Sequence, residues 1–404
     1  MRERINWISN KMEPSPHEAS LALLAEDQIK KVRGFHKSFP IYEPTPLVGL
    51  DQLAKKLGIK NFFLKDESYR FGLNAFKVLG GSYAVGKFIA QRLGKDISEI
   101  SYETMISAET KAKVGDITFY TATDGNHGRG VAWAANKLGQ KSVIAMPVGS
   151  SQTRLKAIQA EGAEATITDM NYDDAVRYVN GLAEKDPNGV MVQDTAWDGY
   201  EEIPSWIMQG YSTMAAEADE QLHDAGIARP THVFVQAGVG SFAGAVQGYF
   251  ANAYKEDCPI TTIVEANVAD CIYRSAQAGK LVPVGGDMQT IMAGLACGEA
   301  CTISWDILKN KAKFFVSAPD WVSAFGMRML AAPLRGDRQV VSGESGSVTS
   351  GLVATLMEDD TYQDFREALG LNEDSVVLVF SSEGDTDPAK YKSIVWDGEC
   401  PSVK

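Results

Sequence analysis

Short apolar runs rich in β-branched residues recur along this 404-residue chain, and helical patterns separate them. The runs are continuous rather than alternating, and they are too short for most helices. Each therefore predicts a strand that is buried on both faces of a parallel sheet. The predicted strands are Phe62–Glu67, Ile117–Ala122, Ser142–Pro147, Ala165–Thr168, Val190–Asp194, His232–Gly238, Thr261–Ala266 and Val376–Ser382.

Helical patterns occupy the intervals between these runs. The clearest of them cover residues 126–139, 153–163, 172–185 and 204–226. Strands that alternate with helices indicate parallel sheets joined by helical crossovers. The sequence therefore predicts an α/β protein made of two open, mostly parallel αβα domains.

The domain boundaries follow from where the alternation is interrupted. The strands between residues 117 and 194 form one compact series, so we predict a smaller domain, residues 70–195, inserted into a larger one formed by 1–69 and 196–404. Within the larger domain, residues 1–40 are expected to form a helical arm. Ligands of open α/β sheets bind beyond the carboxyl ends of the strands, so a cleft between the two sheets is the expected site.

Composition narrows the class of partner. The net charge is −13 and the 39 Lys and Arg residues are scattered, which argues against nucleic acid. No apolar run is long enough to span a bilayer and the first 20 residues resemble no leader, so a cytoplasmic protein is expected. The five cysteines match no zinc-site spacing, so no metal-binding residues are predicted, and a requirement for a cation stays open. Free thiols are predicted, although a pair between Cys271 and Cys297 stays open.

The stretch from Ser68 to Gly81 places one lysine in apolar surroundings. Lys77 is flanked by Phe76, Val78 and Leu79. In a partly dry pocket its amine would lose its charge and become a nucleophile, as a Schiff-base lysine requires. The alternative is a surface lysine on an amphipathic helix, and this stretch alone does not decide between the two.

Two further stretches have the pattern strand, glycine turn, helix. In TATDGNHGRG, Asp124 and Asn126 stand at the tip of the turn, where they either face a ligand or cap the helix. In QAGVGSFAGA, small residues allow backbone amides to converge on one phosphate. A plain tight turn is the alternative there. A dinucleotide site is another, because Glu265 follows at a suitable offset although the glycine spacing does not match.

Taken together, these stretches resemble the fold-type-II family of pyridoxal-phosphate enzymes, which includes threonine and serine dehydratases and tryptophan synthase β. Further matches are EPTPL at 43–47, KDE at 65–67 and SSEGDTD at 381–387. The resemblance implies a bound pyridoxal phosphate. By position in the motifs, Lys77 would hold it covalently and Asn126 would lie beside its 3′-oxygen. Its phosphate would be cupped by Gly238, Val239, Gly240 and Ser241, and Ser381 would meet the pyridine nitrogen.

The resemblance also implies a reaction. Dehydratases of the family typically have serine where this chain has Asp124, and a carboxylate there suits a substrate with a second ammonium group. The implied activity is α,β-elimination of ammonia from D- and L-2,3-diaminopropionate, giving pyruvate and two ammonia molecules. Lys77 and Asp124 would be the bases for the two isomers.

Two further residues and several alternatives complete the expectation. Asp194, at a strand end, would be a second acid near the cleft unless it caps a turn, and Thr123 would contact the substrate. Serine or threonine dehydratase, or another enzyme of β-elimination or β-replacement, is the near alternative. A non-catalytic binding protein or a dinucleotide oxidoreductase is the distant one. A homodimer is expected because relatives are commonly homodimers.

Overall fold

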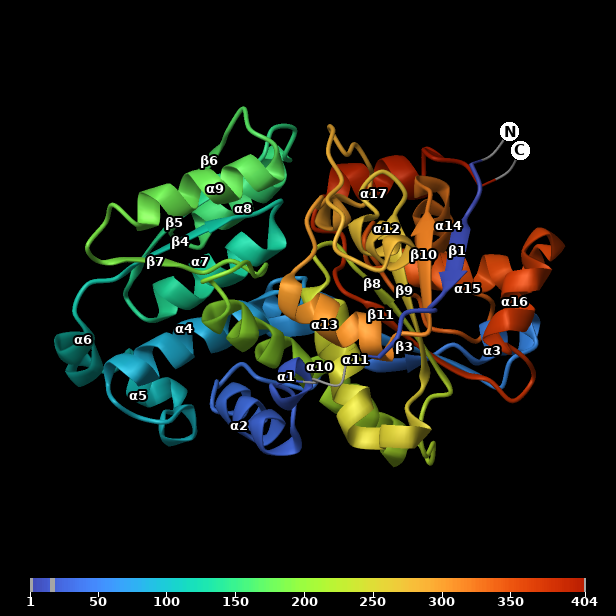
Figure 1. Ribbon diagram of the computed structural model, residues 1–404, viewed down its shortest axis with the longest axis horizontal. Coiled ribbons are helices and arrows are strands. Elements are labelled where there is room, and N and C mark those ends of the chain that lie inside the picture. The colour runs from blue at the N-terminus through green and yellow to red at the C-terminus, as the bar shows by residue number, and fades with distance from the viewer. Residues whose placement is uncertain (1–2, 15–18, 403–404) are drawn as a thin grey trace.

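The computed structural model describes residues 3–14 and 19–402, and within them two sheets stand side by side (Figure 1). The larger sheet has seven strands in the order β1-β10-β9-β8-β11-β3-β2, and the smaller has four in the order β6-β5-β4-β7. The strands are β1 (Asn6–Ser9), β2 (Leu47–Gly49), β3 (Asn61–Asp66), β4 (Thr118–Ala122), β5 (Lys141–Met146), β6 (Glu164–Ile167), β7 (Gly189–Met191), β8 (His232–Gln236), β9 (Ile260–Ala266), β10 (Phe314–Ala318) and β11 (Val376–Ser381).

Both sheets are mostly parallel, which confirms the predicted α/β class. All strand pairs of the smaller sheet are parallel, and so are the pairs that link β10, β9, β8, β11 and β3. The exceptions lie at the edges of the larger sheet, where β1 pairs with β10 and β2 pairs with β3 in antiparallel fashion. All eight predicted strands are present, and every residue of β8 and β11 is buried as expected for strands covered on both faces.

Helices connect and cover the strands. The four predicted helical segments correspond to α7, α8, α9 and α10. The α-helices are α1 (Ala19–Ala22), α2 (Glu26–Lys37), α3 (Asp51–Leu57), α4 (Val78–Arg92), α5 (Tyr102–Ile106), α6 (Ala108–Val114), α7 (Asn126–Lys137), α8 (Gln152–Ala160), α9 (Tyr172–Ala183), α10 (Glu202–Asp224), α11 (Ser241–Tyr254), α12 (Cys271–Ala278), α13 (Thr302–Lys311), α14 (Asp320–Ala331), α15 (Val348–Glu358), α16 (Gln363–Leu369) and α17 (Pro388–Val395).

The expected helical arm is helical only in part. Helix α2 lies within it, but the segment from Asn6 to Ser9 is strand β1. The reason is tertiary, because the strand completes the edge of the larger sheet and Trp7 stacks on Phe365 with ring centroids 4.5 Å apart. Residues 15–18 of the arm lie outside the described residues.

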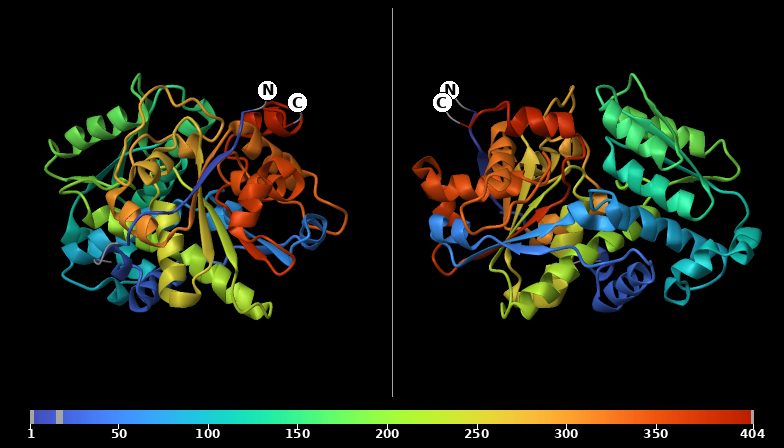
Figure 2. Two further views of the ribbon diagram at one scale, coloured as in Figure 1. Left: turned by 45° about the vertical axis from the view of Figure 1, so that its right-hand side comes forward. Right: turned by 180° about the vertical axis from the view of Figure 1, so that it is seen from behind.

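Two helices cross tightly between the sheets. All strands of the smaller sheet come from residues 118–191, and those of the larger sheet come from the chain on either side. Helices α4 and α10 extend from one sheet toward the other (Figures 1 and 2). A Cβ at Gly210 would lie 2.4 Å from the carbonyl oxygen of Leu79, so glycine is required for this close crossing. The crossing fixes the start of α4, where Lys77 lies.

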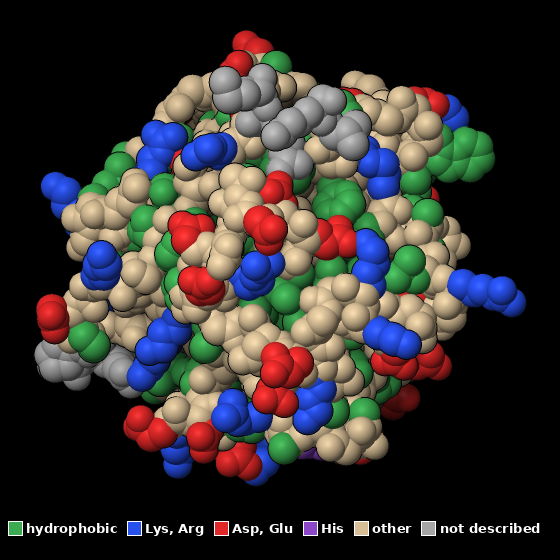
Figure 3. Space-filling view, turned by 90° about the vertical axis from the view of Figure 1, so that its right-hand side faces the viewer, with side chains coloured by type: hydrophobic (Ala, Val, Ile, Leu, Met, Phe, Trp, Pro, Cys, Tyr) green, Lys and Arg blue, Asp and Glu red, His purple; other side chains and the backbone are tan. Residues whose placement is uncertain are grey.

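The surface and the cysteines fit the composition. On the face shown in Figure 3, acidic and basic side chains are interspersed. Among the described residues, no helix is both long and apolar enough to cross a membrane. All five cysteines are free, so Cys271 and Cys297 do not pair in this structure.

Candidate active site

A cavity of about 500 Å³ lies between the two sheets and is lined by residues from both. Its walls include the segments that follow the carboxyl ends of β4, β5, β7, β8 and β11, as expected for parallel sheets. From these segments and the start of α4, the cavity collects most of the predicted site residues: Lys77, Thr123, Asp124, Asn126, Asp194, Gly238, Val239, Gly240 and Ser241. Its volume is in the range of small-molecule sites.

Lys77 immediately precedes α4 and points into this cavity. Its side chain is 18% exposed and its Nζ forms an ion pair with the Asp194 carboxylate, which itself is 2% exposed. The alternative of a surface lysine is therefore wrong. Phe76 and Tyr211 bring their rings to within 5.8 and 5.9 Å of the amine.

The charge of Lys77 differs from the expectation. Burial disfavours the ammonium form, as the sequence suggested, but the adjacent Asp194 carboxylate outweighs that effect and raises the pKa of Lys77. The same pairing works in reverse on the acid. Burial opposes ionisation of Asp194, yet the Lys77 ammonium holds the pKa of Asp194 below its usual range. Lys77 and Asp194 are thus an ionised pair before any ligand binds.

Asp194 is surrounded by further polar groups rather than capping a turn. The hydroxyls of Tyr172 and Tyr211 donate to its carboxylate at 3.4 Å each. The Nε2 atom of His127 lies 2.8 Å from the Val192 carbonyl oxygen, and its Nδ1 lies 3.9 Å from Asp194. Burial lowers the pKa of His127, so the ring is neutral near pH 7 and not a charged partner.

Glycine lets α7 approach Lys77. A Cβ at Gly130 would lie 2.8 Å from the Cα of Val78 and 3.2 Å from the carbonyl carbon of Lys77. The obstructing atoms are backbone, so they cannot rotate away. Gly130 therefore fixes the distance between the DGNHG turn and the lysine.

Replacing Gly130 by alanine is expected to displace the start of α4. We predict a loss of stability of about 1–3 kcal/mol in denaturant unfolding, together with weaker binding of any ligand held by Lys77. Gly181→Ala in α9 is the matched control, because a Cβ there meets nothing within 4 Å. Equal stability of the Gly130→Ala and Gly181→Ala proteins would contradict this interpretation.

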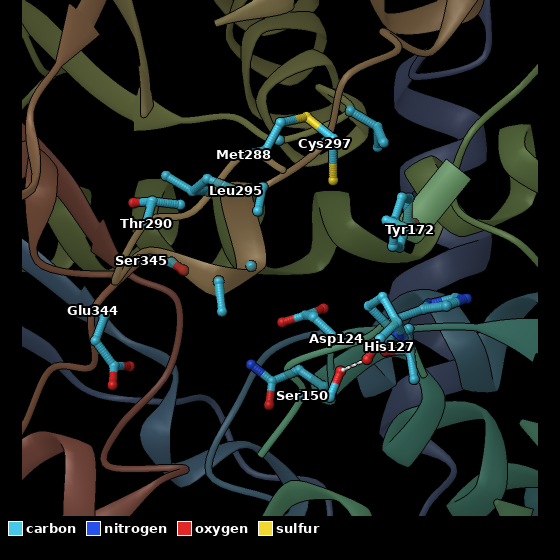
Figure 4. A pocket seen from close by; sticks show the side chains of 18 of the residues that line it. Asp124, His127, Ser150, Tyr172, Met288, Thr290, Leu295, Cys297, Glu344 and Ser345 are labelled. Carbon is cyan, nitrogen blue, oxygen red and sulfur yellow. Dashed lines mark hydrogen bonds between the residues drawn. The ribbon is translucent and has the colours of Figure 1, made fainter. Parts of the chain in front are cut away.

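In the TDGNHG turn, one residue caps the helix and another faces the cavity, which the sequence alone did not show. Thr123, predicted to contact the substrate, accepts hydrogen bonds through its Oγ1 from the Gly125 and Gly128 amides at 2.9 and 3.0 Å. Its hydroxyl oxygen therefore holds the start of α7. Asp124 is left free of that task and extends into the cavity (Figure 4). Asn126 donates its side-chain amide to Glu383.

The glycine loop ends β8 and begins α11. Gly240 has φ +94°, and a Cβ there would lie 2.7 Å from Ile272 Cδ1, so glycine is required on both counts. The first-turn amides of α11 have no partner within the helix and open onto the cavity. The Ser241 hydroxyl donates to the Asp194 carbonyl oxygen, which leaves the serine's amide rather than its hydroxyl for a ligand.

The structure does not bring Ser381 to the cavity. Its hydroxyl is fully buried and donates to Ser342 Oγ at 2.8 Å. The next residue, Ser382, lines the cavity instead, and its Oγ accepts from Gln236 Nε2 at 2.9 Å. Neighbouring residues of a strand point to opposite faces, so a shift of one position decides which serine faces the ligand.

Glu265, the residue that kept a dinucleotide site open, is occupied elsewhere. Its buried carboxylate accepts hydrogen bonds from the amides of Ile272 and Tyr273 at 2.9 and 2.6 Å. Those amides belong to the first turn of α12, so Glu265 caps that helix. The glycine loop therefore lacks the acidic partner that a dinucleotide site requires.

Three residues around the predicted site were not predicted from the sequence. Arg154 and Glu383 line the cavity and the Tyr211 hydroxyl contacts Asp194, yet each stands in a pattern typical of an ordinary helix or loop. Arg154 in particular occupies a helical stretch with polar neighbours, which predicts a solvated position. Glu383 could have been predicted from the sequence, because it lies inside the SSEGDTD motif.

The residues present fit pyridoxal phosphate. The cavity offers a buried amine and the free amides of a helix start for a phosphate. Gly294 keeps the space between Ser345 and Asp124 open, because a Cβ at this position would lie 2.9 Å from Ser345 Oγ and 3.6 Å from Asp124 Oδ2. Within the described part of the chain, Ser345 Oγ, Gln236 Oε1 and His127 Nδ1 are buried without a hydrogen-bond partner. Such unpaired polar atoms indicate a site built for a polar ligand.

Comparisons with known proteins agree with this fit. Residues 39–382 match the family model of pyridoxal-phosphate-dependent enzymes. The chain is 52% identical to diaminopropionate ammonia-lyase of Salmonella typhimurium, covering 94% of this chain and 95% of that protein. It superposes on Escherichia coli diaminopropionate ammonia-lyase in complex with D-serine with a TM-score of 0.91, at 48% identity and 98% coverage of both chains.

A second structure of the E. coli enzyme contains the cofactor. It holds an aminoacrylate–PLP azomethine reaction intermediate, and it is similar to this chain with a TM-score of 0.89, 47% identity and 99% coverage of both chains. Maize serine racemase, at 18% identity and a TM-score of 0.69, shares the fold.

Proposed function

Because the chain belongs to the pyridoxal-phosphate-dependent enzyme family, and within it to the diaminopropionate ammonia-lyases, we propose that the residues of its cavity catalyse the elimination of ammonia from both D- and L-2,3-diaminopropionate. The membership confirms the predicted cofactor, the fold-type-II architecture and the class of carbon–nitrogen lyase. The observation that carries the proposal is one cavity in which the largely buried amine of Lys77 pairs with the carboxylate of Asp194 and the carboxylate of Asp124 lines the same space.

The cofactor would be held by residues of both sheets. We assign covalent attachment to Lys77 Nζ, the 3′-oxygen contact to Asn126, and the phosphate to the amides of Gly238, Val239, Gly240 and Ser241. The assignment of Ser381 to the pyridine nitrogen stays a prediction, and the observation that Ser382 rather than Ser381 lines the cavity does not support it. Bound there, pyridoxal phosphate acidifies the α-hydrogen of an amino acid by accepting electron density.

For the L isomer, Lys77 is the proposed base. Its amine becomes available once the substrate's own amino group has replaced it, and it then takes the α-hydrogen at Nζ. Asp194 pairs with Lys77 while the lysine is charged. When that charge is gone, the carboxylate and the hydroxyls of Tyr172 and Tyr211 can bind the second ammonium of the substrate.

For the D isomer, whose α-hydrogen points the other way, Asp124 is the proposed base. Its carboxylate reaches the cavity from the turn after β4 (Figure 4). Lys77 enters the cavity from a different element, the start of α4. One base on each side of the α-carbon gives a physical reason for one enzyme to process both isomers. After ammonia leaves the β-carbon, hydrolysis of the remaining enamine gives pyruvate and a second ammonia.

The substrate assignment is tested by a panel of amino acids. Pyruvate should form from D- and L-diaminopropionate with kcat/KM at least roughly tenfold above that for D- or L-serine, and 2-oxobutyrate from threonine should be slower still. The reason is that the carboxylates of Asp124 and Asp194 attract the second ammonium group of diaminopropionate more strongly than the hydroxyl group of serine or threonine. Faster turnover of serine or threonine would instead identify a dehydratase.

We further propose that the protein acts as a cytoplasmic homodimer in amino-acid catabolism. The five free cysteines suit a reducing compartment, and members of the fold-type-II family are commonly homodimers. Light scattering of the purified protein tests the assembly directly, and a monomer at micromolar concentration would contradict it.

A further inference from the structure

A buried arginine spans the cavity wall between the two sheets. Arg154 lies on α8, beside the smaller sheet, and its side chain is 8% exposed. Its Nη1 lies 3.8 Å from Asp124 Oδ2, and its Nη2 lies 3.4 Å from Glu344 Oε2 and 3.3 Å from Thr386 Oγ1. Asp124 lies on the smaller sheet's side of the cavity and Glu344 on the larger sheet's side (Figure 4). Thr386 follows β11 of the larger sheet.

The stem of the same side chain rests on the turn that carries Asp124. A Cβ at Gly125 would lie 2.8 Å from Arg154 Cδ, 3.3 Å from its Cγ and 3.4 Å from its Cβ. The aliphatic part of Arg154 therefore covers the backbone directly after Asp124, while the guanidinium flanks the Asp124 carboxylate. Two contacts, an apolar one with the Gly125 backbone and an ionic one with the Asp124 carboxylate, therefore restrain the turn that carries Asp124.

A buried guanidinium is costly unless carboxylates surround it. Burial opposes the charged form of Arg154, but Glu383, Glu344 and Asp124 outweigh this effect and raise its pKa. Its placement consequently depends on acids from both sides of the cavity. If the two sides moved apart, the guanidinium would lose Glu344 and Thr386, and its hold on Asp124 would change.

We propose that Arg154 is a positioning residue that orients Asp124 toward the substrate, with Glu344 and Thr386 anchoring the far end of the guanidinium. The inference rests on the proposed role of Asp124 as the base for the D isomer. Arg154 is placed to act on Asp124 and not on Lys77, whose amine is paired with Asp194. Its effect is therefore selective for one isomer.

The test compares Arg154→Met with Arg154→Lys in enzyme loaded with pyridoxal phosphate. Methionine keeps an unbranched stem over Gly125 but removes the charge, whereas lysine keeps the charge without the fork that serves two carboxylates. We expect Arg154→Met to lower kcat for D-diaminopropionate roughly 10- to 100-fold more than kcat for the L isomer, with KM for both changed less. Arg154→Lys should recover part of the selective loss.

Two controls separate positioning from general damage. Arg177→Met, at a side chain that is 61% exposed, should change neither isomer's turnover. In an Asp124→Asn background, Arg154→Met should produce no further selective loss on the D isomer, because the residue it positions is no longer a base.

Each outcome has a distinct meaning. Equal loss on both isomers, or a full selective loss that persists in the Asp124→Asn background, would overturn the positioning role of Arg154. If Asp124→Asn is itself selective for the D isomer and Arg154→Met is not, the proposed function stands and this inference alone is wrong. If Asp124→Asn leaves the ratio of D to L turnover unchanged, the proposed base is wrong and the inference fails with it.

Discussion

Lys77→Arg is expected to abolish elimination from both isomers of diaminopropionate. Arginine keeps a positive charge beside Asp194, but its guanidinium stays protonated and can neither bond covalently to the cofactor nor accept the α-hydrogen. We predict that release of pyruvate and ammonia falls by roughly 10³-fold or more for each isomer. Steady-state assays of pyruvate measure this directly.

A control substitution of the same kind is available on the same helix. Lys87 lies in α4 with its amine 5.6 Å from the ring centroid of Trp206. Lys87→Arg retains charge and ring contact, so it should retain activity. Ammonia release that survives Lys77→Arg, at the level of Lys87→Arg, would remove the chemical basis of the account.

Asp124→Asn is expected to separate the two isomers. The amide is close in size to the carboxylate but cannot accept a proton as a base, so turnover of D-diaminopropionate should fall roughly 10²- to 10⁴-fold. Turnover of the L isomer should fall by much less, because Lys77 remains. The measurement is kcat for each isomer with the same enzyme preparation.

The matching control is Asp116→Asn, since that carboxylate is 84% exposed and pairs with Lys111 away from the cavity. It should leave both isomers unaffected. Equal loss on the two isomers in Asp124→Asn would mean that Asp124 binds the second ammonium of the substrate and is not a base.

Much of the fold was predictable because parallel strands buried on both faces leave a continuous apolar signature. Most of the eight predicted strands carry that signature, but β6 lies at the edge of the smaller sheet with two of its four residues exposed, so its predicted burial on both faces was wrong. Strands β1 and β2 do not carry that signature, since they are four and three residues long, lie at the sheet edges and pair with partners chosen by tertiary contacts. Strand β10 is different, because Phe314–Ala318 is fully buried and apolar enough for its pattern to have sufficed.

Site residues were predictable where they belong to a short sequence motif. Lys77, Asp124 and the glycine loop stand in short segments whose residue types already indicate a turn, an anion site or a buried amine. The contacts of Arg154 with Glu344 and Thr386 join residues 190 and 232 positions apart, so no local pattern contains them. The burial of Ser381 depends on which face of β11 turns toward the cavity, which only the register of the sheet decides.

The covalent attachment of pyridoxal phosphate to Lys77 is the central claim, and borohydride trapping tests it most directly. The purified protein, incubated with pyridoxal phosphate, should show an absorbance band at the edge of the visible range that shifts on reduction with borohydride. Digestion and mass spectrometry should then find the reduced adduct on the peptide that carries Lys77. An adduct on another lysine, with Lys77 unmodified, would contradict the account.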